Sequence, residues 1–389
     1  MALIALVHKR APGSTMEMAK LIFFIVVPVF VIGPIAGVCV DRWDRRRIMI
    51  VCDVLRGILV LFIPACLIFF NNYFAIYIAV FLIFTITRFF FLSKMAIIPD
   101  IVSKEMLLIA NTLSDTTKLI ATFIGVALAG LIVERIGAVK GFYINSATYF
   151  ISAIFLSGMA VKKIAGHLKD DILLAKDAIK CAINKSLWSQ IIDGLRYILQ
   201  HKELKFVMKS FFFLMAGCGA VSCVIIVFIQ EAFGSVTKDF SILFLFLGFG
   251  AFISAMTYGR FGQKLSKEKV ILNCMLVSGI FVIMFALLTH FVANLWLSSA
   301  VMFFLGLAVS PIVVSLNTMV HELIPQQARG RVFSAQECVV NLGFLVFMFM
   351  SAYLAESIEK VWILVSCGLL FLFWSIFNFV ISRKKIIEG

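Results

Sequence analysis

Long apolar stretches, separated by short polar segments, constrain this chain more than any other feature. A helix needs about 20 apolar residues to cross a bilayer, and a span must satisfy its backbone hydrogen bonds internally. Apolar residues make up 62% of the 389 residues. A water-soluble domain with this composition would have too few polar residues to cover its surface. The sequence therefore predicts an all-α, polytopic membrane protein. The eleven expected spans are 19–40, 48–70, 73–92, 108–133, 141–161, 206–231, 240–260, 270–290, 295–317, 333–355 and 360–382.

The distribution of Lys and Arg predicts the orientation of these spans. Cytoplasmic loops of membrane proteins carry an excess of both residues. With the C-terminus placed in the cytoplasm, 24 of the 35 basic residues lie in inner segments and seven in outer ones. Membrane orientation thus explains the formal charge of +14, and we expect no nucleic-acid partner. The expected location is the cell membrane, with many spans and a cytoplasmic C-terminus.

One long polar segment, 162–205, divides the chain. We expect an N-terminal bundle of five spans in 1–161 and a C-terminal bundle of six spans in 206–389. The polar segment contains apolar residues at helical spacing, which predict an amphipathic helix. Such a helix either lies on the inner membrane face or packs on the protein. Its apolar residues are Trp188, Ile191, Ile192, Leu195 and Ile198.

Two local patterns occur once in each half. The pattern at 37–46, a glycine followed by charged residues, recurs in similar form at 259–267. The Ile-Pro motif at 98–105 recurs in similar form at 324–331. Both repeats come in the same order and at nearly the same offset. Repeated halves of six spans are a known plan for membrane transporters. The patterns therefore favour a transporter built from two related halves.

The segment GPIAGVCVDRWDRRR at 33–47 resembles the cytoplasmic loop motif of the major facilitator superfamily. Together with 98–111, 193–204 and 322–334, it resembles the branch that contains macrolide-efflux and enterobactin-exporter-like proteins. The resemblance implies a two-bundle transporter with twelve helices. The chain opens with a segment that resembles the end of helix 1 and its outer loop. We therefore expect family helix 1 to be missing, through either a misassigned start or a true truncation.

The same resemblance implies a gating motif in the loop after the first span. An anion is favoured near the N-terminus of another helix, so Asp41 would latch the two halves near Val332. The arginines of the motif would pair with acids of their own half, and Asp100 is one candidate. The residues of this motif are Gly37, Asp41, Arg42, Arg45 and Arg46.

Four basic residues lie inside expected spans, where a charge costs about 2.5–3.5 kcal/mol near mid-bilayer. Two of them follow an acidic residue by three positions, so that acid and base lie on the same face of the helix and can pair. These pairs are Asp53 with Arg56, and Asp115 with Lys118. Arg56 is shallow enough to snorkel, which favours a structural role. Arg88 has no such partner, and the resemblance places it on the cavity wall, so it is the strongest functional candidate.

Polar residues in the spans give a candidate substrate cavity. Hydroxyl groups in membrane helices usually bond to their own backbone or to a neighbouring helix, so each residue alone is weak support. The resemblance places those of family helices 4, 7 and 10 nearest the cavity. The expected cavity residues are Thr85, Arg88, Ser222, Ser310 and Asn317.

The sequence contains no phosphate-binding G-x-x-x-x-G-K-[ST] loop and no metal-ligand spacing among its five His. We therefore expect no ATPase or other enzyme activity, no cofactor and no metal. The leading function is export of a small amphipathic or lipophilic solute by a monomer through alternating access. The resemblance adds antiport with protons. The alternatives left open are a lipid or siderophore carrier, an inactive truncated transporter, and a membrane enzyme acting on lipid-linked substrates.

Overall fold

The computed structural model describes residues 1–40, 43–70, 73–103, 106–159, 186–262, 265–324 and 329–387. Within these ranges the chain forms thirteen helices and no strand. Six precede the polar segment: α1 (Ala2–Arg10), α2 (Thr15–Val40), α3 (Arg45–Phe70), α4 (Tyr73–Ile101), α5 (Leu107–Ile136) and α6 (Ala138–Ser157). The others are α8 (Ser186–Gln200), α9 (Lys202–Phe233), α10 (Lys238–Phe261), α11 (Lys267–Phe291), α12 (Leu295–Leu323), α13 (Arg329–Leu354) and α14 (Lys360–Ile387).

Each of the eleven expected spans falls on one long helix, α2 to α6 or α9 to α14. Nine of these helices, within the described ranges, are long and apolar enough to cross a membrane. The expected spans 19–40 and 141–161 correspond to α2 and α6, helices of 26 and 20 residues that are not among the nine. The all-helical, polytopic fold is therefore confirmed, while the count of eleven spans stays a prediction.

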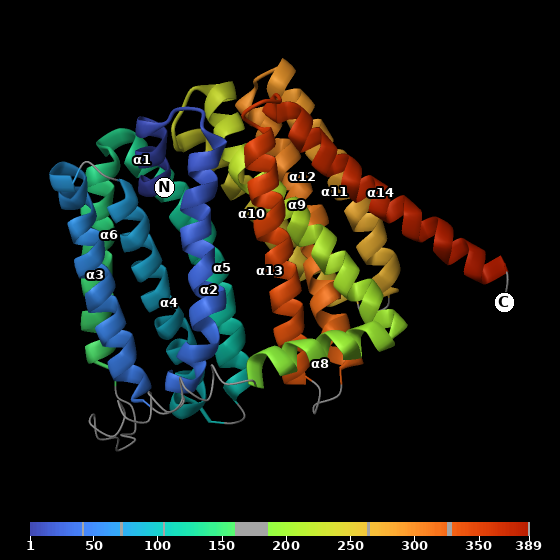
Figure 1. Ribbon diagram of the computed structural model, residues 1–389, viewed down its shortest axis with the longest axis horizontal. Helices are drawn as coiled ribbons and strands as arrows, with labels where there is room; N and C mark the ends of the chain where they lie inside the picture. The colour runs from blue at the N-terminus through green and yellow to red at the C-terminus, as the bar shows by residue number, and fades with distance from the viewer. Residues whose placement is uncertain are drawn as a thin grey trace.

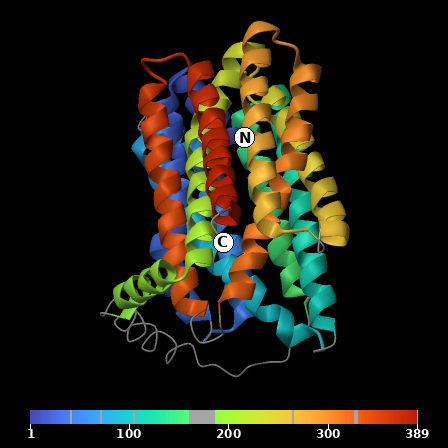
Figure 2. The same ribbon diagram turned by 90° about the vertical axis from the view of Figure 1, so that its right-hand side faces the viewer.

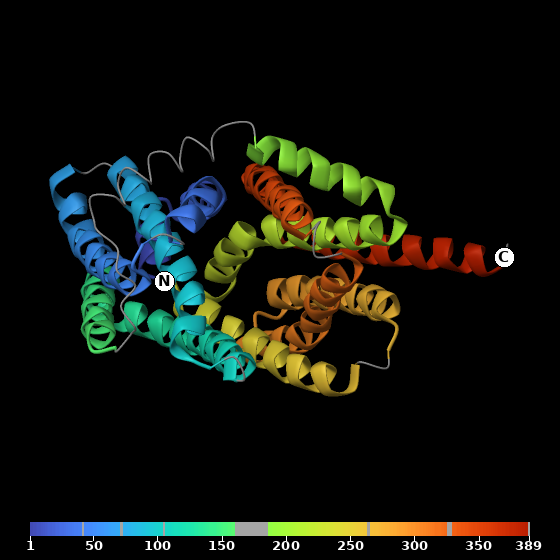
Figure 3. The same cartoon turned by 90° about the horizontal axis from the view of Figure 1, so that it is seen from below.

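The long helices form two groups that lie side by side (Figure 3), and most run along roughly one axis, whereas α14 leaves the second group obliquely (Figures 1 and 2). In the first group α3 packs against α4 and α6, and α4 packs against α2. In the second, α10 packs against α12, α11 against α12 and α14, and α9 against α13 and α14. The groups meet where α5 packs against α10 and α2 packs against α13. The division into two bundles joined by 162–205 stays a prediction, since residues 160–185 lie outside the described ranges.

The two ends of the molecule are marked by short helices. One end carries α1 and is called the α1 end here; the opposite end carries α8 and is called the α8 end (Figure 1). An apolar cluster joins the two groups near the α1 end. It combines buried Met18 and Leu21 of α2 with Cys223 and Ile226 of α9 and with Met348 of α13. Burial of apolar side chains therefore holds the groups together at this end.

The amphipathic helix expected in the polar segment is present as α8. Ile198 is buried in an apolar cluster with residues of α9 and α12, so this side of α8 packs on the protein. Ile192, Leu195 and Leu199 are exposed and recur at i, i+3 and i+7. The side of α8 that carries Ile198 is thus covered by the protein, whereas the stripe of Ile192, Leu195 and Leu199 is exposed and could contact the membrane surface. Contact of that second stripe with the membrane stays a prediction.

Two glycines let α10 and α12 approach closely. A Cβ atom on Gly250 would collide with the carbonyl oxygen of Phe303, and one on Gly306 would collide with that of Leu247. Because backbone atoms cannot yield as a flexible side chain does, the helices must separate to accept a methyl group. The close crossing therefore requires glycine at both positions.

We expect Gly250→Ala to lower the free energy of unfolding by about 1–3 kcal/mol, as overpacking does in other cores. Gly259→Ala is the matched control, because Gly259 lies in the same helix with open space around it. Thermal unfolding of the purified variants in detergent measures both effects. Equal melting temperatures for the two variants would contradict the close crossing.

Candidate functional site

A buried ion pair links three helices of the first group. Arg56 of α3 forms an ion pair with Asp53, one turn earlier in the same helix. The other carboxylate oxygen of Asp53 accepts a hydrogen bond of 2.6 Å from the Ser152 hydroxyl of α6. Asp53 is 1% exposed and Arg56 is 5% exposed. The expected snorkelling of Arg56 is therefore wrong, because neighbouring helices enclose the guanidinium.

Aromatic rings complete the surroundings of Arg56. Its guanidinium carbon lies 4.2 Å from the ring centroid of Phe90 in α4 and 4.7 Å from that of Tyr149 in α6. Its Nε donates to the Cys52 carbonyl oxygen at 3.3 Å. A cation over an aromatic face is stabilised by the ring quadrupole. The group thus ties α3 to α4 and α6, which supports the structural role expected for the pair.

Arg88 of α4 has no comparable partners. Its Nη2 lies 3.5 Å from the Val29 carbonyl oxygen of α2, at the outer limit of a hydrogen bond. Its Nε is buried and makes no hydrogen bond within the described residues. No acid in this part of the chain lies within ion-pair distance of it. A buried donor without an acceptor is destabilising by about 1–3 kcal/mol, so an anionic or hydrogen-bonding ligand would be stabilised here.

A charge that acts on Arg88 comes from the other group of helices. The carboxylate of Glu337 in α13 exerts an electrostatic attraction on the guanidinium. The adjacent Gln336 has its amide oxygen buried without a hydrogen-bond partner among the described residues, and so has the Thr85 hydroxyl, one turn before Arg88. Helices α4 and α13 therefore carry opposite charges that influence each other, and buried polar atoms without partners among the described residues. These are features of a site that binds a polar group.

The loop motif is only partly described. Gly37 belongs to the last turns of α2, whereas Asp41 and Arg42 lie outside the described residues, so the expected latch at Asp41 is not tested. Arg45 donates to the Ala96 carbonyl oxygen near the end of α4 at 2.9 Å. Arg46 donates to the Leu156 carbonyl oxygen at 3.1 Å and also to that of Ser157. These arginines thus bind helix C-terminal carbonyls, where a cation is favoured.

The remaining candidates are spread over other helices. Lys118 is exposed, with its ammonium 4.7 Å from the Phe91 ring centroid, and the side chain of Asp115 is not described. Ser222 donates to the Gly219 carbonyl oxygen of its own helix at 2.7 Å, the contact expected of a structural hydroxyl. Ser310 is half-buried and Asn317 is exposed, both in α12. Within the described residues, no contact joins Ser222, Ser310 or Asn317 to Arg88.

Hydrogen bonds also join the two groups at the α1 end. The His8 ring shares a hydrogen bond of 3.0 Å with the Gln230 amide oxygen. Thr15 donates to the Ala352 carbonyl oxygen at 2.8 Å. These contacts connect α1 to α9 and α2 to α13. They act together with the apolar cluster of α2, α9 and α13 to join the two groups at this end.

A third contact of this kind connects α5 to the start of α10. Glu134 accepts hydrogen bonds from the Thr237 backbone N–H at 3.1 Å and from its hydroxyl at 3.3 Å. Thr237 precedes the first turn of α10, where backbone N–H groups lack helical partners. Glu134 thus supplies an acceptor across the interface between the two groups.

Sequence reasoning missed Glu337, Glu134 and His8. Glu337 lies early in the expected span 333–355, and an acid inside a span is itself a signal of function. Glu134 lies at the end of an expected span and His8 lies in the segment before the first one, and ordinary solvated charges are common in both places. Their partners come from the other half of the chain, so nothing local distinguishes them.

Comparison with known proteins decides the family. A family model of the major facilitator superfamily, described as transmembrane secretion effector, matches residues 14–386. The chain belongs to this family. The superfamily suggested by the loop motif is therefore confirmed, and the nine described helices that are long and apolar enough to cross a membrane agree with it.

Individual relatives are distant but cover most of the chain. The uncharacterized MFS-type transporter YkuC of Bacillus subtilis (strain 168) is 21% identical over 313 residues, which cover 80% of this chain and 70% of YkuC. BacE, a proposed bacilysin exporter of the same organism, is 25% identical over 346 residues, covering 87% of this chain and 80% of BacE. The multi-drug resistance efflux pump PmrA homolog of Lactococcus lactis subsp. lactis (strain IL1403) is 22% identical over 281 residues, which cover 70% of this chain and 64% of that protein. Transporters, including exporters by name, are thus similar to this chain.

Proposed function

We propose that this family member exports a small amphipathic or lipophilic solute from the cytoplasm by alternating access, driven by proton antiport. The family match over 14–386 is the observation that carries the proposal. Relatives named as efflux pumps support the direction of transport. The segments at 98–111, 193–204 and 322–334 further favour the branch of macrolide-efflux and enterobactin-exporter-like proteins.

The proposed cycle uses the contacts between the two groups of helices. At the α1 end, hydrogen bonds such as Thr15 with Ala352 and Glu134 with Thr237 hold the groups together. Release of the solute at this end requires these hydrogen bonds to break and the apolar cluster between α2, α9 and α13 to part, while the rest of each group stays packed. Arg88 of α4 and Glu337 of α13 attract each other electrostatically although they belong to different groups, so a solute held between them would contact both moving parts. Binding there would couple the solute to the rearrangement.

The transport proposal is tested by expressing the chain in a bacterial host that lacks its main efflux pumps. Accumulation of ethidium, a lipophilic cation, and of fluorescein, an anion, is measured in energised cells. We expect lower accumulation of at least one dye, and we expect a protonophore to abolish the difference. If the chain leaves both dyes at the level of cells carrying the empty vector, export of amphipathic solutes is refuted.

The orientation of the chain is a separate prediction. The excess of basic residues predicts that the α8 end lies in the cytoplasm, with Arg47 inside and Lys238 outside. The 71–72 turn, also expected outside, is not described. We expect an impermeant maleimide to label Lys238→Cys in intact cells and Arg47→Cys only after lysis, with the native cysteines as background. Labelling of Arg47→Cys in intact cells would invert the topology.

A further inference from the structure

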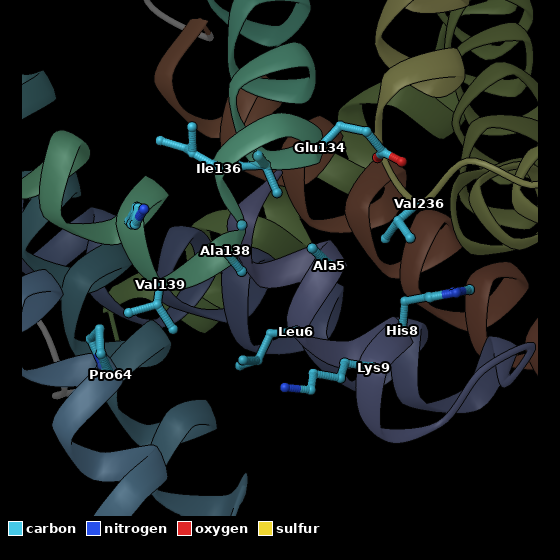
Figure 4. A pocket seen from close by; sticks show the side chains of 13 residues that line it. Ala5, Leu6, His8, Lys9, Pro64, Glu134, Ile136, Ala138, Val139 and Val236 are labelled. Atoms are coloured by element: carbon cyan, nitrogen blue, oxygen red, sulfur yellow. The ribbon is translucent and has the colours of Figure 1, made fainter.

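A cavity of about 910 Å³ lies at the α1 end of the first group (Figure 4). Its walls come from α1, from the end of α5, from the start of α6, from Pro64 of α3 and from Val236, which precedes α10. This volume lies within the range of sites that bind small molecules. The cavity is separate from Arg88, but His8 and Glu134 line it and also join the two groups of helices at this end. What the cavity itself binds therefore needs an explanation of its own.

Two lysines without acidic partners line this cavity. Lys9 comes from α1 and Lys140 from α6. Neither forms an ion pair within the described residues, whereas other lysines at this end do. Lys20 lies 2.7 Å from Glu17, and Lys360 lies 2.9 Å from Glu231. The cavity therefore presents two ammonium groups whose charges the described part of the chain does not neutralise.

The one acid among the described lining residues does not serve these lysines. Glu134 accepts hydrogen bonds from the backbone and hydroxyl of Thr237. In Figure 4 its carboxylate points toward Val236, away from Lys9. The charge available to a ligand in the rest of the cavity is thus positive, and an anion is the complementary ligand.

The remaining walls are apolar. Leu6, Pro64, Ile136 and Val139 line the cavity. Ile136 and Val139 are 39% and 45% exposed, so the apolar wall continues onto the outer surface of the helices. A free inorganic anion would leave this wall uncovered. A molecule with an anionic head and apolar chains would satisfy both the lysines and the wall.

We propose that this cavity binds one anionic phospholipid, with its phosphate held by Lys9 and Lys140 and its acyl chains lying over Ile136 and Val139. The site lies where α5 ends and α6 begins, at the level at which lipid headgroups meet the ends of membrane spans. Basic pockets between membrane helices are a general means of binding anionic headgroups. This site does not depend on the proposed transport function.

The full chain, purified in detergent, tests the site by native mass spectrometry with added phosphatidylglycerol or phosphatidylcholine. We expect wild type to retain one phosphatidylglycerol in preference to phosphatidylcholine. Each basic residue near an anionic lipid strengthens its binding, and the loss of two weakens the affinity by about thirty-fold. The double variant Lys9→Gln/Lys140→Gln should therefore retain little phosphatidylglycerol. The matched control, Lys238→Gln, removes a basic residue at the same end but outside the cavity and should bind as wild type does.

A second variant separates loss of charge from loss of folding. Lys9→Arg with Lys140→Arg keeps both charges and should retain phosphatidylglycerol. The proposal is overturned if the double Gln variant binds as wild type does, if Lys238→Gln weakens binding equally, or if wild type does not distinguish the two lipids. It is also overturned if millimolar inorganic phosphate displaces the lipid completely, because the site would then be one for a free anion.

Discussion

Replacement of Arg88 by Ala is expected to lower the rate of solute export about ten- to hundred-fold while folded protein remains in the membrane. Arg88 has a buried Nε without a partner and only a long contact to Val29, so few contacts within the fold are lost. A hydrogen bond to a charged group contributes about 1.5–3 kcal/mol, which sets the size of the effect on transport. Arg88→Lys should retain part of the activity, because it keeps the charge without the fork of donors.

Two comparisons make this prediction specific. Lys209→Ala removes an exposed basic residue of α9 and should leave export unchanged. Glu337→Gln should also slow export, and its effect should not add to that of Arg88→Ala, because interacting residues show non-additive effects. Dye export in cells with matched protein levels provides the measurement. Full export by Arg88→Ala would contradict a role in transport and would leave Arg88 as a basic side chain that extends toward the membrane surface.

Replacement of Arg56 by Leu is expected to lower the free energy of unfolding by about 3–5 kcal/mol, because it leaves the charge of Asp53 buried without its partner. A bilayer or detergent cannot hydrate that carboxylate. The double variant Asp53→Ala with Arg56→Leu removes both charges and should lose much less stability than Arg56→Leu alone. Thermal unfolding of the purified proteins in detergent measures both.

The exposed pair of Asp44 and Arg47 is the natural control for this experiment. Its side chains are 34% and 62% exposed, and its ion-pair distance is 3.3 Å. Exposed pairs contribute about 0–1 kcal/mol, so Arg47→Leu should change stability little. If Arg56→Leu unfolds at the same temperature as Arg47→Leu, the buried group does not stabilise the first half.

The helices could be predicted from the sequence because the ability to cross a bilayer is a local property. About 20 apolar residues suffice for a span whatever surrounds them, and each predicted stretch lies on one long helix. The pair of Asp53 and Arg56 could be predicted for the same reason, since residues three apart share one face of a helix. The superfamily was also readable, because the loop motif keeps its residues close together in the chain.

Contacts between helices were decided only by the tertiary structure. Hydropathy indicates that Arg56 lies in a span, but not whether it faces lipid or protein; the burial against Phe90 and Tyr149 depends on how α3, α4 and α6 pack. The attraction between Arg88 and Glu337 likewise joins residues from the two halves of the chain. No periodicity in one helix indicates which helix will oppose it. The sequence by itself therefore determined which stretches form the long apolar helices, and helix packing decided which charges are shielded and which stay available to a ligand.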